Sequence, residues 1–267
     1  MNFYDPKNQV EKLENEISNF LSLNKSVGEL AIVMVGKNEA SQKYTLLKQK
    51  LCLKLGITAV IYYIEEALED EKIASQINEI FEKPETAGGI IQLPLPRPSL
   101  KSILNLIPFN KDIDLLSSKS LDQFYSGNFT KLSPVVRATQ DFMLQNRINY
   151  ENQRITLIGR GDLVGRPLEW FFTSKGAKTT VADDYKTGEK LDCDILILSA
   201  GVPNLVNGND ISANTHVIDF GSSVVENKTV GDLNLNSQLE HLGCVSPSPG
   251  GMGPLVVRYL LKNFLGL

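Results

Sequence analysis

Short, wholly apolar runs alternate along the chain with stretches in which apolar residues recur every three or four positions. Leu30–Val35 is such a run and stops at Gly36, which is typical of a strand buried on both faces. From Glu39 to Leu55 the pattern is helical, and it ends at Gly56. By the same criteria we predict a helix opened by Asp5-Pro6, a strand at Ile57–Ile64, a helix around Ile73–Phe81 and a short strand at Gly88–Leu93.

A second alternation begins at Arg154, after a polar and loop-like stretch from Asn110 to Leu132. Strand and helix then follow each other closely enough to form a complete βαβ unit, which predicts a parallel sheet with helices on its faces. Its parts are a strand at Ile155–Ile158, a loop at Gly159–Pro167, a helix through Phe172 and a strand at Lys178–Ala182. Later strands are expected at Ile195–Leu198 and Val217–Phe220, and a last helix at Pro254–Phe264.

These elements predict an α/β protein with two domains and a cleft between them. A length of 267 residues fits that number. We expect an N-terminal α/β domain of residues 1–120, onto which the C-terminal helix, residues 252–267, packs back. Residues 121–251 are expected to form a Rossmann-type domain with a parallel sheet.

Composition and charge narrow the class of protein. Hydrophobic residues make up 42% and charged residues 22%, which indicates a globular chain. The net charge of -4 and the absence of a long basic run disfavour nucleic-acid binding. The N-terminus shows no signal peptide, and the apolar runs are too short to span a bilayer. Three scattered cysteines and two histidines favour a reducing cytoplasm and predict neither disulfides nor a metal site.

The loop after Ile158 is a candidate dinucleotide site. Gly159, Gly161 and Gly165 follow a strand and open a helix, so the backbone can approach a pyrophosphate at the helix N-terminus. The spacing is one residue longer than the usual Rossmann fingerprint, and only the strand–loop–helix–strand context makes it informative. Asp183 and Asp184 close the next strand, where an acid accepts the ribose 2′-OH and favours NAD. Both are equally compatible with a solvated turn.

Tyr44 and Lys48 form a second candidate site, because residues four apart share one face of a helix. Such a pair is by itself most often a solvated polar pair. It belongs, however, to a set of motifs that follow one another over nearly the whole chain. They are Ala40-Ser41-Gln42-x-Tyr44-x-x-x-Lys48 with Gly56-Ile57, Gly89-Ile90-Ile91-Gln92-Leu93-Pro94-Leu95-Pro96, Lys111-Asp112-Ile113-Asp114, the loop Gly159–Pro167, and Pro247-Ser248-Pro249-Gly250-Gly251-Met252-Gly253-Pro254.

In order and in residue type these motifs resemble those of the bifunctional methylenetetrahydrofolate dehydrogenase/methenyltetrahydrofolate cyclohydrolase family. The resemblance implies oxidation of 5,10-methylenetetrahydrofolate with NAD(P) and hydrolysis of the product to 10-formyltetrahydrofolate, in one-carbon metabolism and purine biosynthesis. It also implies a cytoplasmic homodimer that binds tetrahydrofolate derivatives.

The resemblance further implies roles for single residues. Lys48 would be the acid/base residue, and Tyr44 would stack on the aminobenzoyl ring of the folate. Gln92 would hydrogen-bond Lys48, and Asp114 would anchor the pterin. Other substrate contacts would be Leu93, Pro94, Gly250, Gly251 and Pro254. The cofactor contacts would be Gly159, Arg160, Gly161, Val164, Gly165, Asp183, Asp184, Gly201 and Ser222.

The sequence departs from the family pattern at several places. Leu115 stands where the family usually has glycine, Pro134–Arg137 replaces Pro-Cys-Thr-Pro, Val256 replaces threonine, and the stretch from Asp183 to Asp194 is shortened. In the family the Pro134–Arg137 segment faces the nicotinamide end. Arg160 favours NADP, because an arginine there helps to hold a 2′-phosphate, whereas the two aspartates favour NAD. We expect NADP, with NAD as the alternative.

Three other functions are compatible with part of the pattern. One of the two activities could be weakened, given the altered nicotinamide segment. A non-catalytic folate- or nucleotide-binding paralogue is disfavoured by intact Tyr44, Lys48 and Gln92. A shikimate-dehydrogenase-like enzyme shares the architecture and a lysine in the first domain, but it does not explain Gln92–Pro96 or the Pro247–Pro254 motif.

Overall fold

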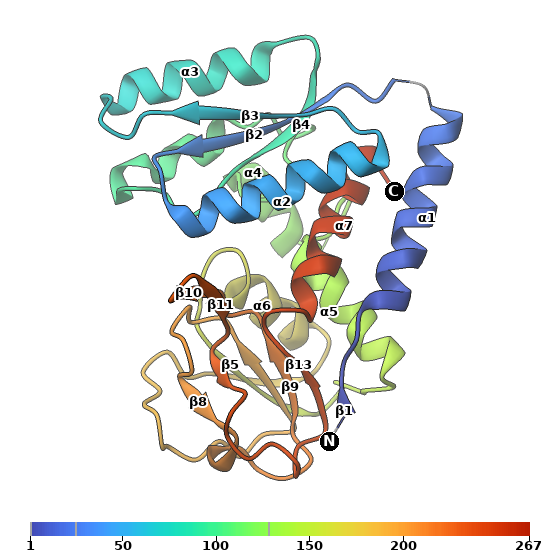
Figure 1. Ribbon diagram of the computed structural model, residues 1–267, viewed down its shortest axis with the longest axis vertical. Helices are drawn as coiled ribbons and strands as arrows, with labels where there is room; N and C mark the ends of the chain where they lie inside the picture. The colour runs from blue at the N-terminus through green and yellow to red at the C-terminus, as the bar shows by residue number, and fades with distance from the viewer. Residues whose placement is uncertain (1, 25, 128) are drawn as a thin grey trace. The chain divides into compact units, whose positions relative to one another are not determined.

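The structure is a computed structural model that describes residues 2–24, 26–127 and 129–267. It divides into two compact units. Figure 1 shows the chain coloured from blue at the N-terminus to red at the C-terminus. Of the described residues, unit 1 comprises 2–11 and 134–259, and unit 2 comprises 12–24, 26–127, 129–133 and 260–267. Residues 121–127 and 129–133, expected with the Rossmann-type domain, thus group with unit 2, and residues 2–11 group with unit 1.

Unit 2 contains a three-stranded parallel sheet in the order β3 (Ala59–Ile64), β2 (Glu29–Val35), β4 (Thr86–Ile91). The central strand β2 is the wholly apolar run, and its residues from Leu30 onward are all buried. In Figure 1 the helices α2 (Glu39–Leu55) and α3 (Asp70–Glu82) lie on opposite sides of this sheet. Burial of both faces is the physical reason for the uninterrupted apolar pattern.

Helix α2 begins and ends where the sequence predicts. The Asn38 side chain accepts a hydrogen bond from the backbone N–H of Ser41 at 2.9 Å, which satisfies one of the free donors of the first turn. Gly56 ends the helix with φ +80°, and its N–H bonds to the carbonyls of the last turn. Glycine adopts this left-handed conformation without steric cost, so the helix has a fixed length and register.

The polar stretch before residue 133 is not a loop throughout, and this expectation was wrong. It contains the helix α4 (Ser118–Tyr125), in which Phe124 is buried. Ser117 caps this helix by accepting from the N–H of Ser120. Eight residues form about two turns, which is too short for a helical period to be visible. A 3₁₀ helix, η1, spans Pro98–Leu106 and begins at a proline.

Unit 1 contains a six-stranded parallel sheet. The order is β1 (Asn2–Phe3), β13 (Cys244–Ser246), β9 (His216–Asp219), β7 (Ile195–Leu198), β5 (Arg154–Ile158) and β6 (Lys178–Val181). The strands predicted for this sheet are present. Its two other strands, β1 and β13, were not predicted, because a strand of two or three residues is too short to show a periodic pattern. Smaller pairs are β8 (Val206–Asn207) with β12 (Leu233–Asn234), and β10 (Ser223–Val225) with β11 (Lys228–Val230); a 3₁₀ turn η2 spans Gly208–Asp210.

Two helices of unit 1 pack against each other, α5 (Pro134–Gln145) and α6 (Gly165–Ser174). Helix α5 was not predicted, and the departure from the family pattern at Pro134–Arg137 is its first turn. Val135 and Val136 are buried there, so they belong to the core of unit 1. Arg137 lies with its guanidinium 4.9 Å from the ring centroid of Tyr259.

The first and last helices contribute to both units. Helix α1 (Lys7–Leu23) begins directly after Asp5-Pro6, and the N–H of Lys7 donates to Asp5 at 3.0 Å. Helix α7 (Met252–Leu265) belongs to unit 1 up to Tyr259 and to unit 2 from Leu260. The turns of α7 from Leu260 onward thus group with the described residues of 12–133, while its first turns group with unit 1. No helix among the described residues is both long enough and apolar enough to cross a membrane.

Asn263 fixes the end of α7 to unit 2. It is 4% exposed, and its side-chain nitrogen donates to the carbonyls of Ile113 at 3.0 Å and of Leu132 at 2.9 Å. We predict that Asn263→Ala lowers the free energy of unfolding by about 1–3 kcal/mol, because buried carbonyls lose their donor. Denaturant unfolding followed by circular dichroism measures this. Asn24→Ala, at an exposed helix end, is the matched control with an expected loss below about 0.5 kcal/mol. Equal losses in the two variants would contradict the prediction.

Candidate active site

Lys48 is a buried lysine on the inner face of α2, with 6% of its surface exposed. Its Nζ donates to Gln92 Oε1 at 2.9 Å and lies 4.7 Å from the ring centroid of Tyr44. The helical spacing of four residues places Tyr44 beside Lys48, as the sequence predicts. Gln92, far away in sequence, is brought to the same place because it directly follows β4.

The Gln92 amide is fixed in one orientation. Its backbone N–H donates to Val33 at 2.8 Å, which extends the pairing of β4 with β2 by one residue. Its Nε2 donates to the carbonyl of Leu93 at 2.7 Å, so that Oε1 is left to accept from Lys48. Ser41 on α2 also donates to that carbonyl, at 3.2 Å. The helix and the end of β4 are therefore held in register by polar contacts at the position of the lysine.

Asp114 supplies the charge that faces Lys48. Burial lowers the pKa of Lys48 to about 8, and the Asp114 carboxylate opposes this by favouring the ammonium. Burial likewise raises the pKa of Asp114 to about 6, which Lys48 opposes and Asp112 reinforces. Burial thus makes the Lys48 ammonium release its proton more readily than a free lysine does. A proton acceptor is thus present near neutral pH.

The loop that carries Asp114 is held on both sides. The fully buried Asp112 carboxylate accepts from the N–H of Ser117 at 2.9 Å and from its hydroxyl at 2.7 Å. Lys131 Nζ donates to the carbonyls of Asn110 at 3.0 Å and of Asp112 at 3.3 Å. With Asn263 on the carbonyl of Ile113, these bonds fix the backbone on both sides of the aspartate.

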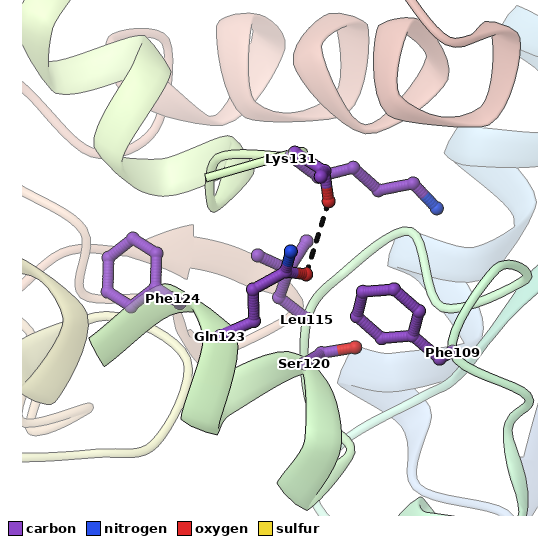
Figure 2. Close-up of a pocket in the computed structure, with 7 residues that line it drawn as sticks. Phe109, Leu115, Ser120, Gln123, Phe124 and Lys131 are labelled. Carbon is purple, nitrogen blue, oxygen red and sulfur yellow. Dashed lines mark hydrogen bonds between the residues drawn. The ribbon is translucent and has the colours of Figure 1, made fainter. Parts of the chain in front are cut away.

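Leu115 shows how the chain accommodates its departure from the family pattern. Its φ of +59° is left-handed, a conformation that glycine adopts freely and that costs a branched residue about 1–2 kcal/mol. The side chain is 6% exposed, and burying a leucine contributes about 1.5–3 kcal/mol, which offsets this cost. Figure 2 shows Leu115 between Phe109 and Phe124. These three residues help to line a small cavity of about 10 Å³. Leucine thus adopts a left-handed turn at this position, and its side chain is buried within unit 2.

The glycine loop of unit 1 fits a bound pyrophosphate. Gly159 has φ +97°, and a Cβ there would lie 2.5 Å from the backbone of Ser199. A Cβ on Gly165 would lie 2.1 Å from the carbonyl oxygen of Gly159. Among the described residues nothing lies within 4 Å of the Cβ position of Gly161, so its backbone can be approached. Val164 precedes α6, and no described side chain caps that helix, whose N-terminus suits an anion.

The predicted ribose contacts lie at the same edge of the sheet. Leu157 of β5 is paired with Val181 of β6, so the segments that follow these strands are neighbours. Asp183 and Asp184 follow β6 and are exposed. Arg160 follows β5, and its guanidinium bonds to Glu169 of α6.

Two buried carboxylates in unit 1 were missed by the sequence analysis. Asp232 is fully buried and accepts three backbone N–H groups, from Ala200 at 2.6 Å, Gly201 at 3.1 Å and Val202 at 2.9 Å. It therefore fixes the turn after β7, which includes the predicted cofactor residue Gly201. Burial raises the pKa of Asp232, and these three donors oppose the rise.

Asp219, at the end of β9, does the same for the next turn. It accepts from the N–H groups of Gly221 at 2.8 Å and Leu233 at 2.9 Å, on either side of the predicted cofactor residue Ser222 and the hairpin β10–β11. Burial raises its pKa to about 7. The available sequence signal was an acid at the end of an otherwise apolar strand, which predicts a buried hydrogen-bonded carboxylate.

The remaining predicted substrate residues fall into two groups. Leu93 and Pro94 directly follow Gln92 in unit 2. Gly250, Gly251 and Pro254 lie in unit 1, between the carboxyl end of β13 and the first turn of α7. Gly250 has φ +102°, and the N–H of Gly251 donates to the carbonyl of Pro247 at 2.8 Å, which closes a tight turn. Among the described residues no group of three or more His, Cys, Asp or Glu could hold a metal ion.

Comparisons with known proteins match both parts of the chain to one family. The family model described as the catalytic domain of tetrahydrofolate dehydrogenase/cyclohydrolase matches residues 5–114. The model for the NAD(P)-binding domain of the same family matches residues 134–267. The two models together cover most of the chain.

Individual relatives have similar length. The bifunctional protein FolD of Aquifex aeolicus is 31% identical over 262 residues, which cover 96% of this chain and 89% of the relative. FolD of Clostridium novyi is 32% identical, with 96% and 91% covered. The crystal structure of the bifunctional FolD dehydrogenase/cyclohydrolase from Campylobacter jejuni superposes with a TM-score of 0.86 at 27% identity, covering 99% of this chain and 97% of that one. This chain belongs to the bifunctional tetrahydrofolate dehydrogenase/cyclohydrolase family.

Proposed function

We propose that the chain oxidises 5,10-methylenetetrahydrofolate to 5,10-methenyltetrahydrofolate with NAD(P) and hydrolyses that product to 10-formyltetrahydrofolate. The observation that carries the proposal is the buried amine of Lys48, held by a neutral amide and faced by the Asp114 carboxylate. The names of the relatives support the same pair of reactions.

The hydrolysis needs a group that exchanges protons near neutral pH. Water adds to the cationic methenyl carbon, and neutral Lys48 accepts a proton from it. The bond from that carbon to N5 then breaks, the Lys48 ammonium returns a proton to N5, and the formyl group stays on N10. The second proton of the water leaves to solvent, so the step balances without another reactant.

Gln92 suits this role because it is uncharged. It orients the amine by accepting a hydrogen bond, whereas a carboxylate at the same position would hold the lysine as an ammonium. In the oxidation, bound NAD(P) would supply the hydride acceptor. The part of this chain is then to place the folate, with Tyr44 stacked on the aminobenzoyl ring and Asp114 anchoring the pterin.

Each of the two predicted domains would bind one of the two ligands. Residues 1–120 with 252–267 would bind the folate, and residues 121–251 would bind the dinucleotide. The family's NAD(P)-binding model over residues 134–267 supports the second assignment. Between the two cofactors, family resemblance favours NADP, while Asp183 and Asp184 favour NAD. The homodimer and the cytoplasmic location expected from the resemblance remain predictions.

Assays of both half-reactions with purified protein test the proposal. Hydride transfer is followed as reduced dinucleotide with the methylene substrate, separately with NAD and NADP. Hydrolysis is followed as loss of methenyltetrahydrofolate, after subtraction of the spontaneous rate. If only one of the two activities is detected, the chain is a monofunctional member of the family. If neither is detected, it is a non-catalytic binding protein.

We predict that Lys48→Met abolishes hydrolysis and stabilises the fold. The folded pKa of about 8 lies below the ordinary lysine value of 10.5, so the folded chain binds its proton more weakly than the unfolded chain. The resulting penalty is fully present below pH 8 and disappears as the pH rises to 10.5. Methionine removes it, and the free energy of unfolding should rise by about 1–2 kcal/mol at pH 7.

The control for this variant is Lys50→Met, an exposed lysine on the same helix. It should keep both activity and stability. Hydrolysis at the wild-type rate by Lys48→Met would refute the role of Lys48. A gain in stability that persists unchanged at pH 10.5 would refute the pKa argument.

We further predict that Gln92→Glu shifts the pH dependence of hydrolysis upward. In the wild-type protein the rate should rise through pH 8, as the neutral amine of Lys48 forms. A carboxylate in hydrogen-bond contact favours the ammonium, so the midpoint should rise by about one pH unit and the rate at pH 7 should fall roughly tenfold. Gln92→Met removes the hydrogen bond without adding charge and should lower the rate without raising the midpoint. An unchanged midpoint in Gln92→Glu would contradict this assignment.

A further inference from the structure

The guanidinium of Arg160 is already bound by a carboxylate of its own unit. Arg160 Nε donates to Glu169 Oε2 at 2.8 Å, and Nη2 donates to Oε1 at 3.2 Å. Two nitrogens on two oxygens form a bidentate pair, the geometry with which arginine also binds phosphate. The Glu169 side chain is 25% exposed and lies on α6, whose position is set by the buried side chains of Leu168, Phe171 and Phe172. The carboxylate is therefore presented from a fixed helix.

The segments that follow β5 and β6 carry further charges, among them the exposed Lys186. Arg166, the second arginine near the glycine loop, pairs with Asp162 at 3.1 Å. Asp183 and Asp184 are exposed at the end of β6, the strand paired with β5. In a Rossmann unit this is where the adenine ribose lies, and an acid there accepts a hydrogen bond from the 2′-OH. An arginine in its place accommodates a 2′-phosphate.

We propose that Glu169 makes the dinucleotide site select NAD over NADP, by holding Arg160 in an ion pair that a 2′-phosphate would have to break. The inference rests on the proposed dinucleotide site and specifies its ligand as NAD, in place of the NADP expected from the family resemblance. A 2′-phosphate carries a charge of about -1.5 to -2 near neutral pH. It would face Asp183 and Asp184 and would compete with Glu169 for the arginine. A 2′-OH is neutral, so these carboxylates do not repel it and it does not need Arg160 as a counter-charge.

Calorimetric titration with oxidised NAD and with oxidised NADP, in the absence of folate, tests this without relying on turnover. The variants are Glu169→Gln, the double variant Glu169→Gln with Arg160→Ala, and Asp162→Asn as matched control. The control also removes a carboxylate from an arginine near the same loop, but not from Arg160. Thermal unfolding of each variant verifies that it is folded.

The wild-type protein should bind NAD at least about threefold more tightly than NADP. Glu169→Gln should move the ratio of dissociation constants toward NADP by roughly three- to tenfold, the scale of an exposed ion pair. Adding Arg160→Ala should remove that shift, and Asp162→Asn should leave the ratio within about twofold of wild type.

Tighter binding of NADP by the wild-type protein, or an unchanged ratio in Glu169→Gln, would overturn the inference. So would a shift that survives Arg160→Ala, because the gain would then not pass through the arginine. Failure of the proposed function gives a different result: selective binding of NAD without hydride transfer to it from the folate. That outcome would leave the role of Glu169 intact.

Discussion

The burial of the Lys48 amine is the constraint on which the candidate site depends. An amine inside a protein loses the hydration of its charged form, and this lowers its pKa to about 8. That loss destabilises the fold, but it produces a proton acceptor that free lysine lacks at neutral pH. The surrounding contacts limit the loss: Gln92 accepts from the amine, the Tyr44 ring lies beside it, and Asp114 favours its charge. Stability and chemistry thus oppose each other at one side chain.

In unit 1 two segments with predicted cofactor residues are held by buried carboxylates that accept hydrogen bonds from several backbone N–H groups. Asp232 fixes the turn after β7 and Asp219 fixes the segments on both sides of the β10–β11 hairpin. Turns at the carboxyl edge of a parallel sheet have no strand partners for their backbone groups, and unsatisfied buried donors are costly. The two aspartates supply these partners from within the protein. The segments that carry the predicted cofactor residues Gly201 and Ser222 are therefore held by hydrogen bonds from within the protein.

Two of the departures from the family pattern are accommodated by packing. Leu115 keeps the left-handed backbone of a glycine position and buries its side chain beside Phe109 and Phe124. Val135 and Val136 form the first turn of α5 within the core of unit 1. These changes add apolar volume where the fold encloses it, and they leave the hydrogen bond between Lys48 and Gln92 in place. They are compatible with both proposed activities.

The sequence by itself determined the elements with a strong local signal. The apolar run of β2, the cap and terminal glycine of α2, and the glycine loop before α6 are visible because propensity, periodicity and capping act between near neighbours. The ordered motifs also identified the family and the pair Tyr44 and Lys48. They implied the contact between Gln92 and that lysine as well. Only the tertiary structure decided that Asp219 and Asp232 hold the turns with the predicted cofactor residues, and that Arg160 is bound by Glu169. These contacts join residues whose proximity follows from strand order and helix packing, which no local pattern encodes. The lowered pKa of Lys48 belongs to the same class, because burial is a property of the assembled fold.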